Sequence, residues 1–471
     1  MHNRRLHAFP VDVCLKDCYH LHAMSAKREI WHRRIRSGIS KAWRWFMPGL
    51  GVKRWVLIVL LGTTLIGLGL AVLILDVYRN SPETWWLPYL SVASLRTLER
   101  PLRALIFGGL GAFLILIGLL GINRSLMAPY LSSGKPVVDS LASYRRRERG
   151  PRIVAIGGGH GLATLLRGMK KFSHNITAVV SVADDGGSSG RLRKTKGILP
   201  PGDIRNCLAA LSGDEALMAQ LFQYRFADEE GDLEGRLEGH TFGNLFISAL
   251  AEITGSFEEA VAESGRVLAV HGRVLPSTLH DVQLAADVIL PHTTSEVRVQ
   301  GESSIPESAG RIRRVWLEPN DPPAFPDAIH AILAADLIIV GPGSLYTSIL
   351  PNLLVPDIAA AISASRALKV YVCNVATQPG ETDGYSCGDH VHVLEEHLGS
   401  GLFDIVVANS NCGEPLTEGV DWVRTEEDFE VDHPVYRADL IDQIRPWRHS
   451  SEKLGQVIMD LYQERTGPLV E

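Results

Sequence analysis

Five short apolar segments of this chain each end abruptly in glycine or in a small or polar residue. They are Arg152 to Ile156, Ile176 to Ala183, and the runs ADLIIVGPGS, LKVYVCNV and DIVVANS. Segments with helical spacing lie between them, at 162–172 and near 325–335, 356–366 and 389–398. Short unbroken apolar runs that alternate with helices are typical of strands buried on both faces. The sequence therefore predicts an α/β fold, with a doubly wound, mostly parallel sheet covered by helices.

Two much longer apolar segments precede this region. Residues 55–75 and 104–122 contain 21 and 19 residues without a charged side chain. Each is long enough to cross about 30 Å of hydrocarbon as a helix. Nine lysines and arginines lie in residues 27–54 and seven in residues 124–152, but only four lie between the two segments. By the positive-inside rule, these counts predict a multi-pass plasma-membrane protein with both termini and the carboxyl-terminal domain in the cytoplasm.

This pattern divides the chain into four predicted parts. They are a basic cytoplasmic segment (1–54), a transmembrane hairpin (55–122), a linker (123–150) and an α/β domain (151–471). The formal net charge of the chain is −6. Because the chain is not basic as a whole, we expect no nucleic acid among its partners.

The first predicted strand runs into a glycine-rich turn before a helix. Its residues are Gly157, Gly158, Gly159, His160 and Gly161. Backbone amides in such a turn, together with the amino end of the helix, favour an anionic group. Close packing alone is the alternative explanation. Leu162 takes the place of the third glycine of the dinucleotide fingerprint, which makes an NAD-dependent dehydrogenase a weak hypothesis.

The second predicted strand ends in two adjacent acids, Asp184 and Asp185. The loop after them contains Gly186, Gly187, Ser188 and Ser189. Two carboxylates beside glycines suit the hydroxyl groups of a sugar or ribose, or a hydrated divalent cation. Arg191 and Arg193 follow, and we expect them to face a diphosphate. The alternative is that this basic cluster is a solvated loop.

Further candidate residues follow other segment boundaries. They are Asp203, Arg205 and Asn206 in LPPGDIRN; His240 and Asn244 in GHTFGNLF; Gly341, Gly343, Ser344, Tyr346 and Thr347 in GPGSLYTS; and Asn374. Open α/β sheets bind ligands at the carboxyl ends of their strands, so these residues should gather at one edge of the sheet. Two alternatives remain open, because an acid at a helix start is often only a cap and a lone histidine is more often structural.

In this order, the motifs resemble one family. GGGHGLATLLRGMK, SVADDGGSSGRLR, GILPPGDIRNCLAAL, GHTFGNLF and ADLIIVGPGSLYTSILPNLLV are similar to the YvcK proteins, known as gluconeogenesis factors. The resemblance covers about residues 150–465. It implies a Rossmann-like fold that binds UDP-sugars, notably UDP-N-acetylglucosamine, and a link between gluconeogenic growth, cell-wall synthesis and cell shape. Usual members have GGGTG, so His160 is a departure.

The YvcK proteins are in turn similar to the CofD 2-phospho-L-lactate transferases. CofD proteins move a phospholactyl group from a guanosine diphosphate-type donor, with magnesium, so a transferase of this kind is the alternative function. The resemblance matches Asp203 to the acceptor-binding acid and Arg448 to a later basic residue. Asp184 and Asp185 would hold the magnesium. The chain has no obvious nucleophile–base pair, which favours a membrane-anchored regulator that requires no cofactor. The expected partners are a UDP-sugar, the lipid bilayer, a second copy of the chain and cell-wall synthesis proteins.

Overall fold

The computed structural model describes residues 145–213, 217–226, 237–290, 295–308 and 310–466, together with scattered residues between 63 and 116. The chain divides into two compact units, Met1–Tyr144 and Arg145–Glu471, which are described separately. The predicted boundaries of the basic segment, hairpin and linker lie almost wholly outside the described residues. They stay predictions.

The predicted multi-pass membrane location is contradicted. Within the described residues, no single helix is both long and apolar enough to cross a membrane. One pair of helices reaches the necessary length together, Leu345–Leu353 with Pro356–Ala364, but the pair is bent by 75°. Its apolar residues, such as Leu350 and Ile358, are buried in the core of the α/β unit. Segments 55–75 and 104–122 lie mostly outside the described residues, and the few residues described inside them are helical.

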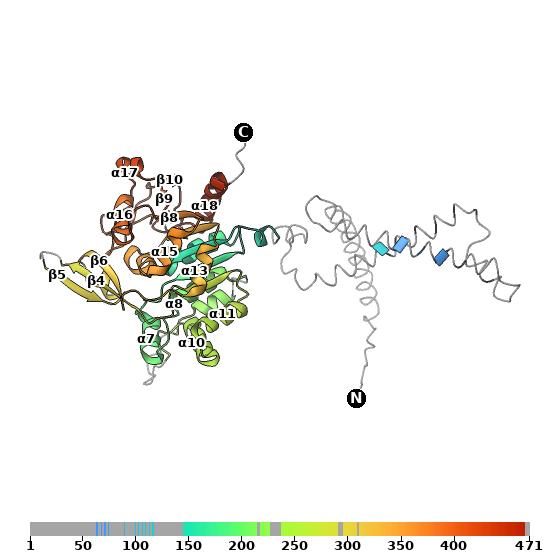
Figure 1. Cartoon of the computed structure of the whole chain (residues 1–471), viewed down its shortest axis with the longest axis horizontal. Helices are drawn as coiled ribbons and strands as arrows, with labels where there is room; N and C mark the ends of the chain where they lie inside the picture. The colour runs from blue at the N-terminus through green and yellow to red at the C-terminus, as the bar shows by residue number, and fades with distance from the viewer. Residues whose placement is uncertain are drawn as a thin grey trace, which may run out of the picture. The chain divides into compact units, whose positions relative to one another are not determined.

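The second unit is built around a seven-stranded sheet with the order β10-β9-β8-β7-β1-β2-β3 (Figure 1). Every neighbouring pair is parallel. The strands are β1 (Ile153–Gly157), β2 (Ile176–Val180), β3 (Arg273–Pro276), β7 (Leu337–Val340), β8 (Leu368–Val372), β9 (Ile405–Asn409) and β10 (Val435–Ala438). Strands β1, β2, β7 and β9 are buried along their whole length, which explains their unbroken apolar sequences. The predicted Rossmann-like α/β fold is confirmed for this unit.

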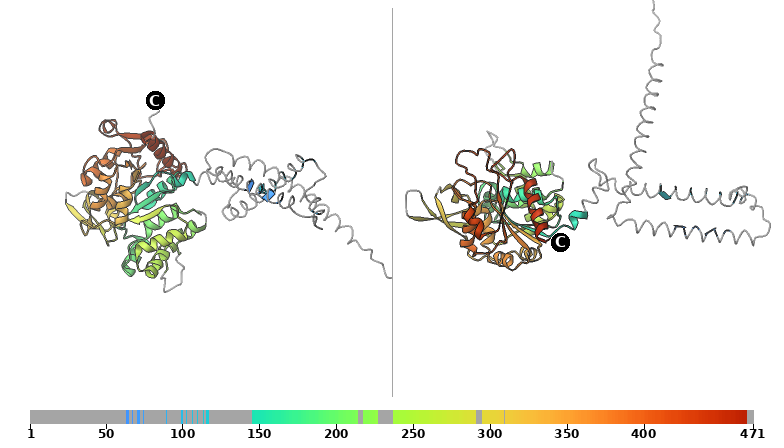
Figure 2. Two further views of the ribbon diagram at one scale, coloured as in Figure 1. Left: turned by 45° about the vertical axis from the view of Figure 1, so that its right-hand side comes forward. Right: turned by 90° about the horizontal axis from the view of Figure 1, so that it is seen from above.

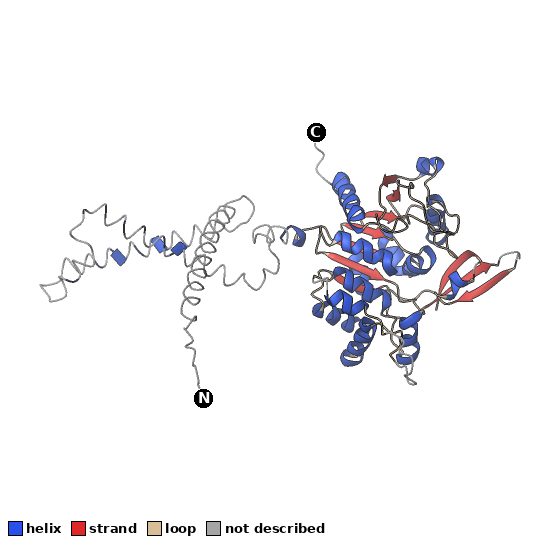
Figure 3. Ribbon diagram, turned by 180° about the vertical axis from the view of Figure 1, so that it is seen from behind, coloured by secondary structure: helices blue, strands red, loops and turns tan. Residues whose placement is uncertain are grey.

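Helices flank the sheet on both faces (Figures 2 and 3). They are α6 (Gly159–Met169), α7 (Gly187–Lys196), α8 (Gly202–Leu211), α9 (Leu217–Gln223), α10 (Phe242–Thr254), α11 (Phe257–Val267), α12 (Ser304–Glu307), α13 (Pro326–Leu333), α14 (Leu350–Leu353), α15 (Pro356–Ala364), α16 (Cys387–Leu398), α17 (Glu427–Asp432) and α18 (Ser451–Thr466), with a π-helical turn at Leu345–Ile349. Helix α6 packs against both α8 and α18. The contact with α18 is close, because a Cβ on Gly168 would lie 3.2 Å from the Cα of Gly455.

A second, three-stranded antiparallel sheet was not predicted from the sequence. Its order is β5-β4-β6, with β4 at Gln283–Ile289, β5 at Glu296–Gln300 and β6 at Arg311–Glu318. Figure 1 shows it projecting from one side of the unit. The segment that connects β5 to β6 returns toward the main sheet and contributes to the site described below.

Strand β1 occupies the position in the main sheet where the chain changes direction. From β1 the chain continues to β2 and β3 on one side, and it later returns to the other side at β7. Gly157 of β1 is paired with Val180 of β2, and Ile156 with Val340 of β7. The loops that follow these strands must therefore diverge, and open α/β sheets bind ligands at such a point.

Candidate functional site

The loops that follow β1 and β7 lie against each other. Gly161 is so close to Pro342 that a Cβ at position 161 would collide with the carbonyl of Pro342. A Cβ on Gly158 would lie 2.5 Å from a carboxylate oxygen of Asp203, at the start of α8. Gly159 has a φ of +62°, which side chains disfavour. The predicted glycine-rich turn is therefore needed for the close approach of three segments.

A cavity of about 560 Å³ opens between these loops, and we call it the first cavity. The predicted residues that line it are Gly158, Gly159, His160, Gly161, Asp184, Asp203, Gly343, Ser344, Asn374 and Arg448. They come from the loops after β1, β2, β7 and β8, from the start of α8 and from the segment before α18. Segments far apart in the sequence thus form one concave surface.

Asp203 is held against the amino end of α6. Its carboxylate accepts a hydrogen bond from the backbone N–H of Gly159. Burial, and after it the charge of Asp184, raise the pKa of Asp203 to about 6, while Gly159 and Arg205 act in the opposite direction. One N–H at the start of α6 is therefore already bound by a carboxylate. The N–H groups of His160 and Gly161, in the same turn, have no intrahelical partner.

The two adjacent acids have different partners. Asp184 lines the first cavity, and its Oδ1 accepts a hydrogen bond of 2.9 Å from the N–H of Gly186. Asp185 instead accepts two hydrogen bonds from Ser303, from its N–H at 3.0 Å and from its Oγ at 2.9 Å. Asp185 therefore anchors the turn that places Glu302 in the cavity.

Glu302 is a third acid that the sequence did not predict. It lines the first cavity and shares a hydrogen bond with the side chain of Asp184. Burial, followed by the charges of Asp184 and Asp203, raises the pKa of Glu302 well above its usual 4.5. With Asp184 and Asp203, Glu302 forms the acidic end of the first cavity.

The adjacent acids Asp184 and Asp185 were predicted from the sequence as ligands of a divalent cation. Among the residues that the structure describes, no group of three His, Cys, Asp or Glu side chains is arranged to hold a metal ion. Asp185 is bound to Ser303, whereas Asp184 lines the first cavity. Asp184 and Asp185 therefore have separate surroundings in this structure, and magnesium stays a prediction.

Four other predicted residues lie behind the first cavity rather than in its lining. They are Ser188, Ser189, His240 and Asn244, and all are buried. The hydroxyl of Ser188 lies 3.0 Å from His240 Nδ1 and accepts a 3.0 Å hydrogen bond from Asn244 Nδ2. These contacts join the start of α7 to the start of α10, and so they fix the loop formed by Gly186 and Gly187.

The residues after β7 and β8 support one another. Ser344 donates a 2.6 Å hydrogen bond to Gln378, and both line the first cavity. Asn374 accepts a bond of 3.2 Å from the N–H of Gly343 and donates one of 2.9 Å to its carbonyl. The cavity wall is therefore held by paired polar groups.

Tyr346 and Thr347, also predicted, do not line the first cavity. The hydroxyl of Tyr346 lies 2.9 Å from that of Tyr385, and Thr347 donates a 3.0 Å hydrogen bond to Glu381. Burial raises the pKa of Glu381 to about 7. Both hydroxyl groups are used within the protein.

Arg191 and Arg193, which were predicted to face a diphosphate, do not line the first cavity. Arg191 donates a 2.6 Å hydrogen bond to the carbonyl of Glu238. Arg193 is buried, donates to the carbonyl of Val282 at 2.7 Å and pairs with Asp281 at 2.5 Å. Helix α7 therefore carries both guanidinium groups away from the cavity.

A second cavity, of about 440 Å³, meets the first at three shared residues, His160, Thr164 and Arg448. Its other lining residues are Ala163, Arg167, Asn206, Gln223 and Arg445. Three arginines and no acid line the second cavity, whereas three acids and only one arginine line the first. Burial, and after it the charges of Arg448, Arg205 and Arg167, lower the pKa of His160 below 6.5, so its imidazole is neutral at pH 7.

Comparison with known proteins now connects this geometry to a family. The family model for the 2-phospho-L-lactate transferase CofD matches residues 153–445. The chain belongs to the CofD-like family. Membership is compatible with magnesium, although no cofactor follows from it.

Curated relatives named gluconeogenesis factor place the chain among these proteins within the CofD-like family. The protein named "Gluconeogenesis factor" from Bacillus subtilis (strain 168) is 44% identical over 336 residues, which cover 67% of this chain and 99% of the relative. A relative from Nostoc sp. is 44% identical over 459 residues, covering 94% of this chain and 93% of its own length. The crystal structure of a upf0052 family member from Bacillus halodurans has a TM-score of 0.60 and 42% identity, covering 66% of this chain and 99% of that one.

The CofD-like site contains residues that the sequence did not predict. They are Thr164, Glu302, Pro342, Ser348, Thr377, Gln378, Trp447 and His449 in the first cavity, and Arg167, Gln223 and Arg445 in the second. One signal was available for the second cavity. His160, Thr164 and Arg167 are spaced i, i+4 and i+7 on α6, so they share one face of that helix.

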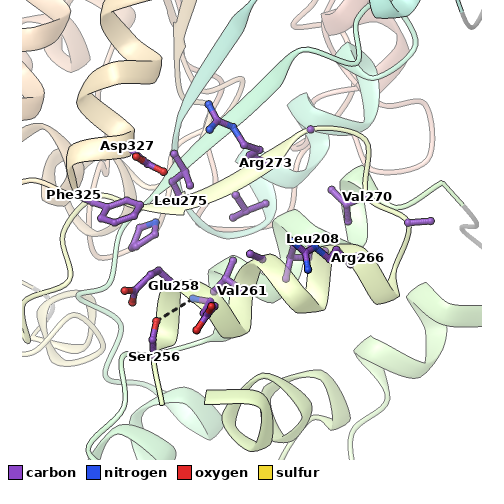
Figure 4. A pocket seen from close by; sticks show the side chains of 17 residues that line it. Leu208, Ser256, Glu258, Val261, Arg266, Val270, Arg273, Leu275, Phe325 and Asp327 are labelled. Atoms are coloured by element: carbon purple, nitrogen blue, oxygen red, sulfur yellow. Dashed lines mark hydrogen bonds between the residues drawn. The ribbon is translucent and has the colours of Figure 1, made fainter. Parts of the chain in front are cut away.

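Another cavity of this CofD-like unit, of about 670 Å³, lies between α11 and the edge strand β3 (Figure 4). Apolar side chains such as Leu208, Val261 and Leu275 line it, with Glu258 and Arg266 beside them. None of the predicted site residues contributes to it. The candidate site is therefore the pair of cavities at the carboxyl ends of β1 and β7.

Proposed function

We propose that this CofD-like protein is a regulatory factor that binds a UDP-sugar, notably UDP-N-acetylglucosamine, in the first cavity. The observation that carries the proposal is the meeting of an acidic, amide-lined cavity with a cationic one at the amino end of α6. The hydroxyl groups of a sugar or ribose can donate to Asp184 and exchange hydrogen bonds with Thr377. The diphosphate is attracted to the N–H groups of His160 and Gly161 and to the guanidinium of Arg448.

The dimensions and charges of the first cavity support a nucleotide-linked ligand. Its volume of about 560 Å³ falls within the roughly 300–1,000 Å³ of small-molecule sites. Acids at one end do not favour the phosphoryl group itself, because like charges repel. The phosphates therefore belong at the end occupied by Arg448, and the sugar or ribose belongs at the end occupied by Asp184.

The same charge distribution makes a CofD-like transferase the less favoured function. Phosphoryl transfer requires cations around the transferred group, and among the described residues Arg448 is the only arginine or lysine in the lining of the first cavity.

The cellular role that we propose is control of cell-wall synthesis and cell shape during gluconeogenic growth. The name shared by the relatives and the family resemblance support this role. We propose a second copy of the chain and cell-wall synthesis proteins as its partners.

The test is calorimetric titration of the full chain with UDP-N-acetylglucosamine and with free N-acetylglucosamine. The nucleotide sugar should bind and the free sugar should not. Arg448→Gln should weaken binding about ten- to a hundredfold, since it removes a charge-assisted contact. Arg366→Gln is the matched control, because Arg366 is exposed and precedes the amino end of β8, at the opposite edge of the sheet. The proposal would be contradicted if UDP-N-acetylglucosamine did not bind, or if Arg448→Gln bound it with the same affinity as the wild type. Formation of a product with magnesium would favour the transferase.

A further inference from the structure

Three exposed arginines line the second cavity and offer many hydrogen-bond donors to a ligand. Arg167, Arg445 and Arg448 each carry five N–H groups. In the part of the chain that the structure describes, the guanidinium groups of these three arginines form no ion pair and no hydrogen bond with another residue. This distinguishes them from Arg193 and Arg191, whose guanidinium groups are bound.

Asn206 adds to this excess of donors. Its carbonyl oxygen accepts hydrogen bonds from Arg205 at 2.9 Å and from Gln223 at 3.0 Å. Since the oxygen is already used twice, the amide NH₂ group is the part of Asn206 that remains for the cavity. Neighbouring residues therefore fix the orientation in which Asn206 donates.

The positive charge of this region acts on His160, which lines both cavities. After burial, the charges of Arg448, Arg205 and Arg167 lower the pKa of its imidazole. The diphosphate of a sugar nucleotide bears two negative charges, which do not balance three arginines. The surroundings thus favour a ligand with more negative charge than a UDP-sugar whose sugar is uncharged.

The position of the second cavity shows how one ligand can reach both. His160, Thr164 and Arg448 belong to both linings, so no separate entrance is required. A diphosphate at the amino end of α6 would leave the group attached to it next to Arg167 and Arg445.

We propose that the second cavity is an anion subsite, which receives a carboxylate or phosphate that the ligand carries beyond its diphosphate. The ligand class is then a nucleotide-linked compound with an additional negative charge. The inference rests on the proposed function, because the bound diphosphate is what positions the ligand at the junction of the cavities.

The experiment compares ligands that differ in one charged group, with the full chain. UDP-glucuronate differs from UDP-glucose in having a carboxylate at C6 of the sugar, and UTP differs from UDP in having an additional phosphate. One of the two charged ligands should bind about ten- to a hundredfold more tightly than its reference. A preference for UDP-glucuronate identifies the extra group as a carboxylate, and a preference for UTP identifies it as a phosphate.

Variants of the arginines test whether the second cavity causes the preference for the charged ligand. In Arg445→Gln and Arg167→Gln the affinity ratio between the charged and the reference ligand should fall toward one, whereas in Arg366→Gln it should stay as in the wild type. Arg445 is exposed, so this variant should fold normally, and circular dichroism checks the fold of all three. If UDP-glucose binds but neither charged ligand is preferred, the inference is wrong and the proposed function stands. A preference that persists in both variants also overturns it. If no uridine nucleotide binds, the proposed function fails and the inference fails with it.

Discussion

Replacing Asp184 with asparagine should stabilise the ligand-free protein at pH 7.5 and weaken its binding of a UDP-sugar. Asp184 lies beside Asp203 and Glu302, and its charge raises the pKa of both. Asparagine keeps an oxygen that can accept the hydrogen bond from Gly186. The substitution Asp184→Asn therefore relieves repulsion with Asp203, and the new amide NH₂ group can donate to Glu302 in place of the hydrogen bond that the two carboxyl groups share.

The magnitude follows from the pKa of Asp203, which rises from 3.8 to about 6. A rise of about two pKa units corresponds to a cost of about 3 kcal/mol in the free energy of unfolding. Burial is the larger cause and Asp184 the second, so we attribute about 1 kcal/mol to Asp184. Because the folded state holds this proton more tightly, the cost develops as the pH rises from 3.8 to about 6 and is complete above that. The gain from Asp184→Asn should thus be about 1 kcal/mol at pH 7.5 and close to zero at pH 4.

Urea unfolding of the full chain, followed by circular dichroism at both pH values, measures this difference. Asp185→Asn is the matched control, since it removes the charge from the acceptor of two Ser303 hydrogen bonds. We expect that variant to be destabilised by about 1–2 kcal/mol at pH 7.5. If Asp184→Asn is destabilised as well, or if its gain is the same at pH 4, the acids serve only the structure and the reasoning is refuted.

Three further results are expected. Gly161→Ala should lower the melting temperature and abolish UDP-sugar binding, because the added methyl group would collide with the carbonyl of Pro342. At Gly265, on α11, an added methyl group would meet no backbone atom within 4 Å, so Gly265→Ala should leave the melting temperature and the binding unchanged. His160→Thr should bind UDP-N-acetylglucosamine with the affinity of the wild type between pH 7 and 8, because the imidazole is neutral there; a loss of about tenfold would show that the imidazole itself contacts the ligand. Calorimetry should give the same dissociation constant for UDP-N-acetylglucosamine in the presence of EDTA and in the presence of magnesium. A gain in affinity of about tenfold with magnesium would show that the acidic end holds a cation together with the ligand.

The main sheet could be predicted because strands buried on both faces have a simple pattern. Strand β7 is LIIV and β9 is IVVAN, and each is followed at once by a loop. The antiparallel sheet offered no such pattern. Strand β5, EVRVQ, is exposed along most of its length, and β6 carries three arginines among its apolar residues. Periodicity alone does not separate such segments from loops.

The site was predicted best where strands of the main sheet end. Asp184, Ser344 and Asn374 each follow such a strand, and all three line the first cavity. Glu302 was missed because its turn belongs to the sheet that was not predicted. Its place in the cavity depends on a bond between Asp185 and the neighbouring serine, far away in the sequence.

The cations were predicted poorly for a different reason. Arg191 and Arg193 follow the glycine loop closely, but the direction of α7 decides where their side chains go, and short-range sequence does not give that direction. Arg445 lies just before Arg448 in the segment RPWR, whereas Arg167 lies far from both in the sequence. Only the packing of α6 near the segment before α18 brings Arg167 to the same cavity as these two arginines.

The contact between α6 and α18, close at Gly168 and Gly455, has a consequence for how the protein is made. The glycine-rich turn of the site lies at the start of α6, whereas Arg448 lies just before α18. A chain still on the ribosome therefore presents an incomplete cavity until the segment up to α18 has left the exit tunnel. A ligand stabilises only the state that binds it, so nucleotide cannot assist the growing chain. It can stabilise only molecules whose synthesis has passed the end of the site.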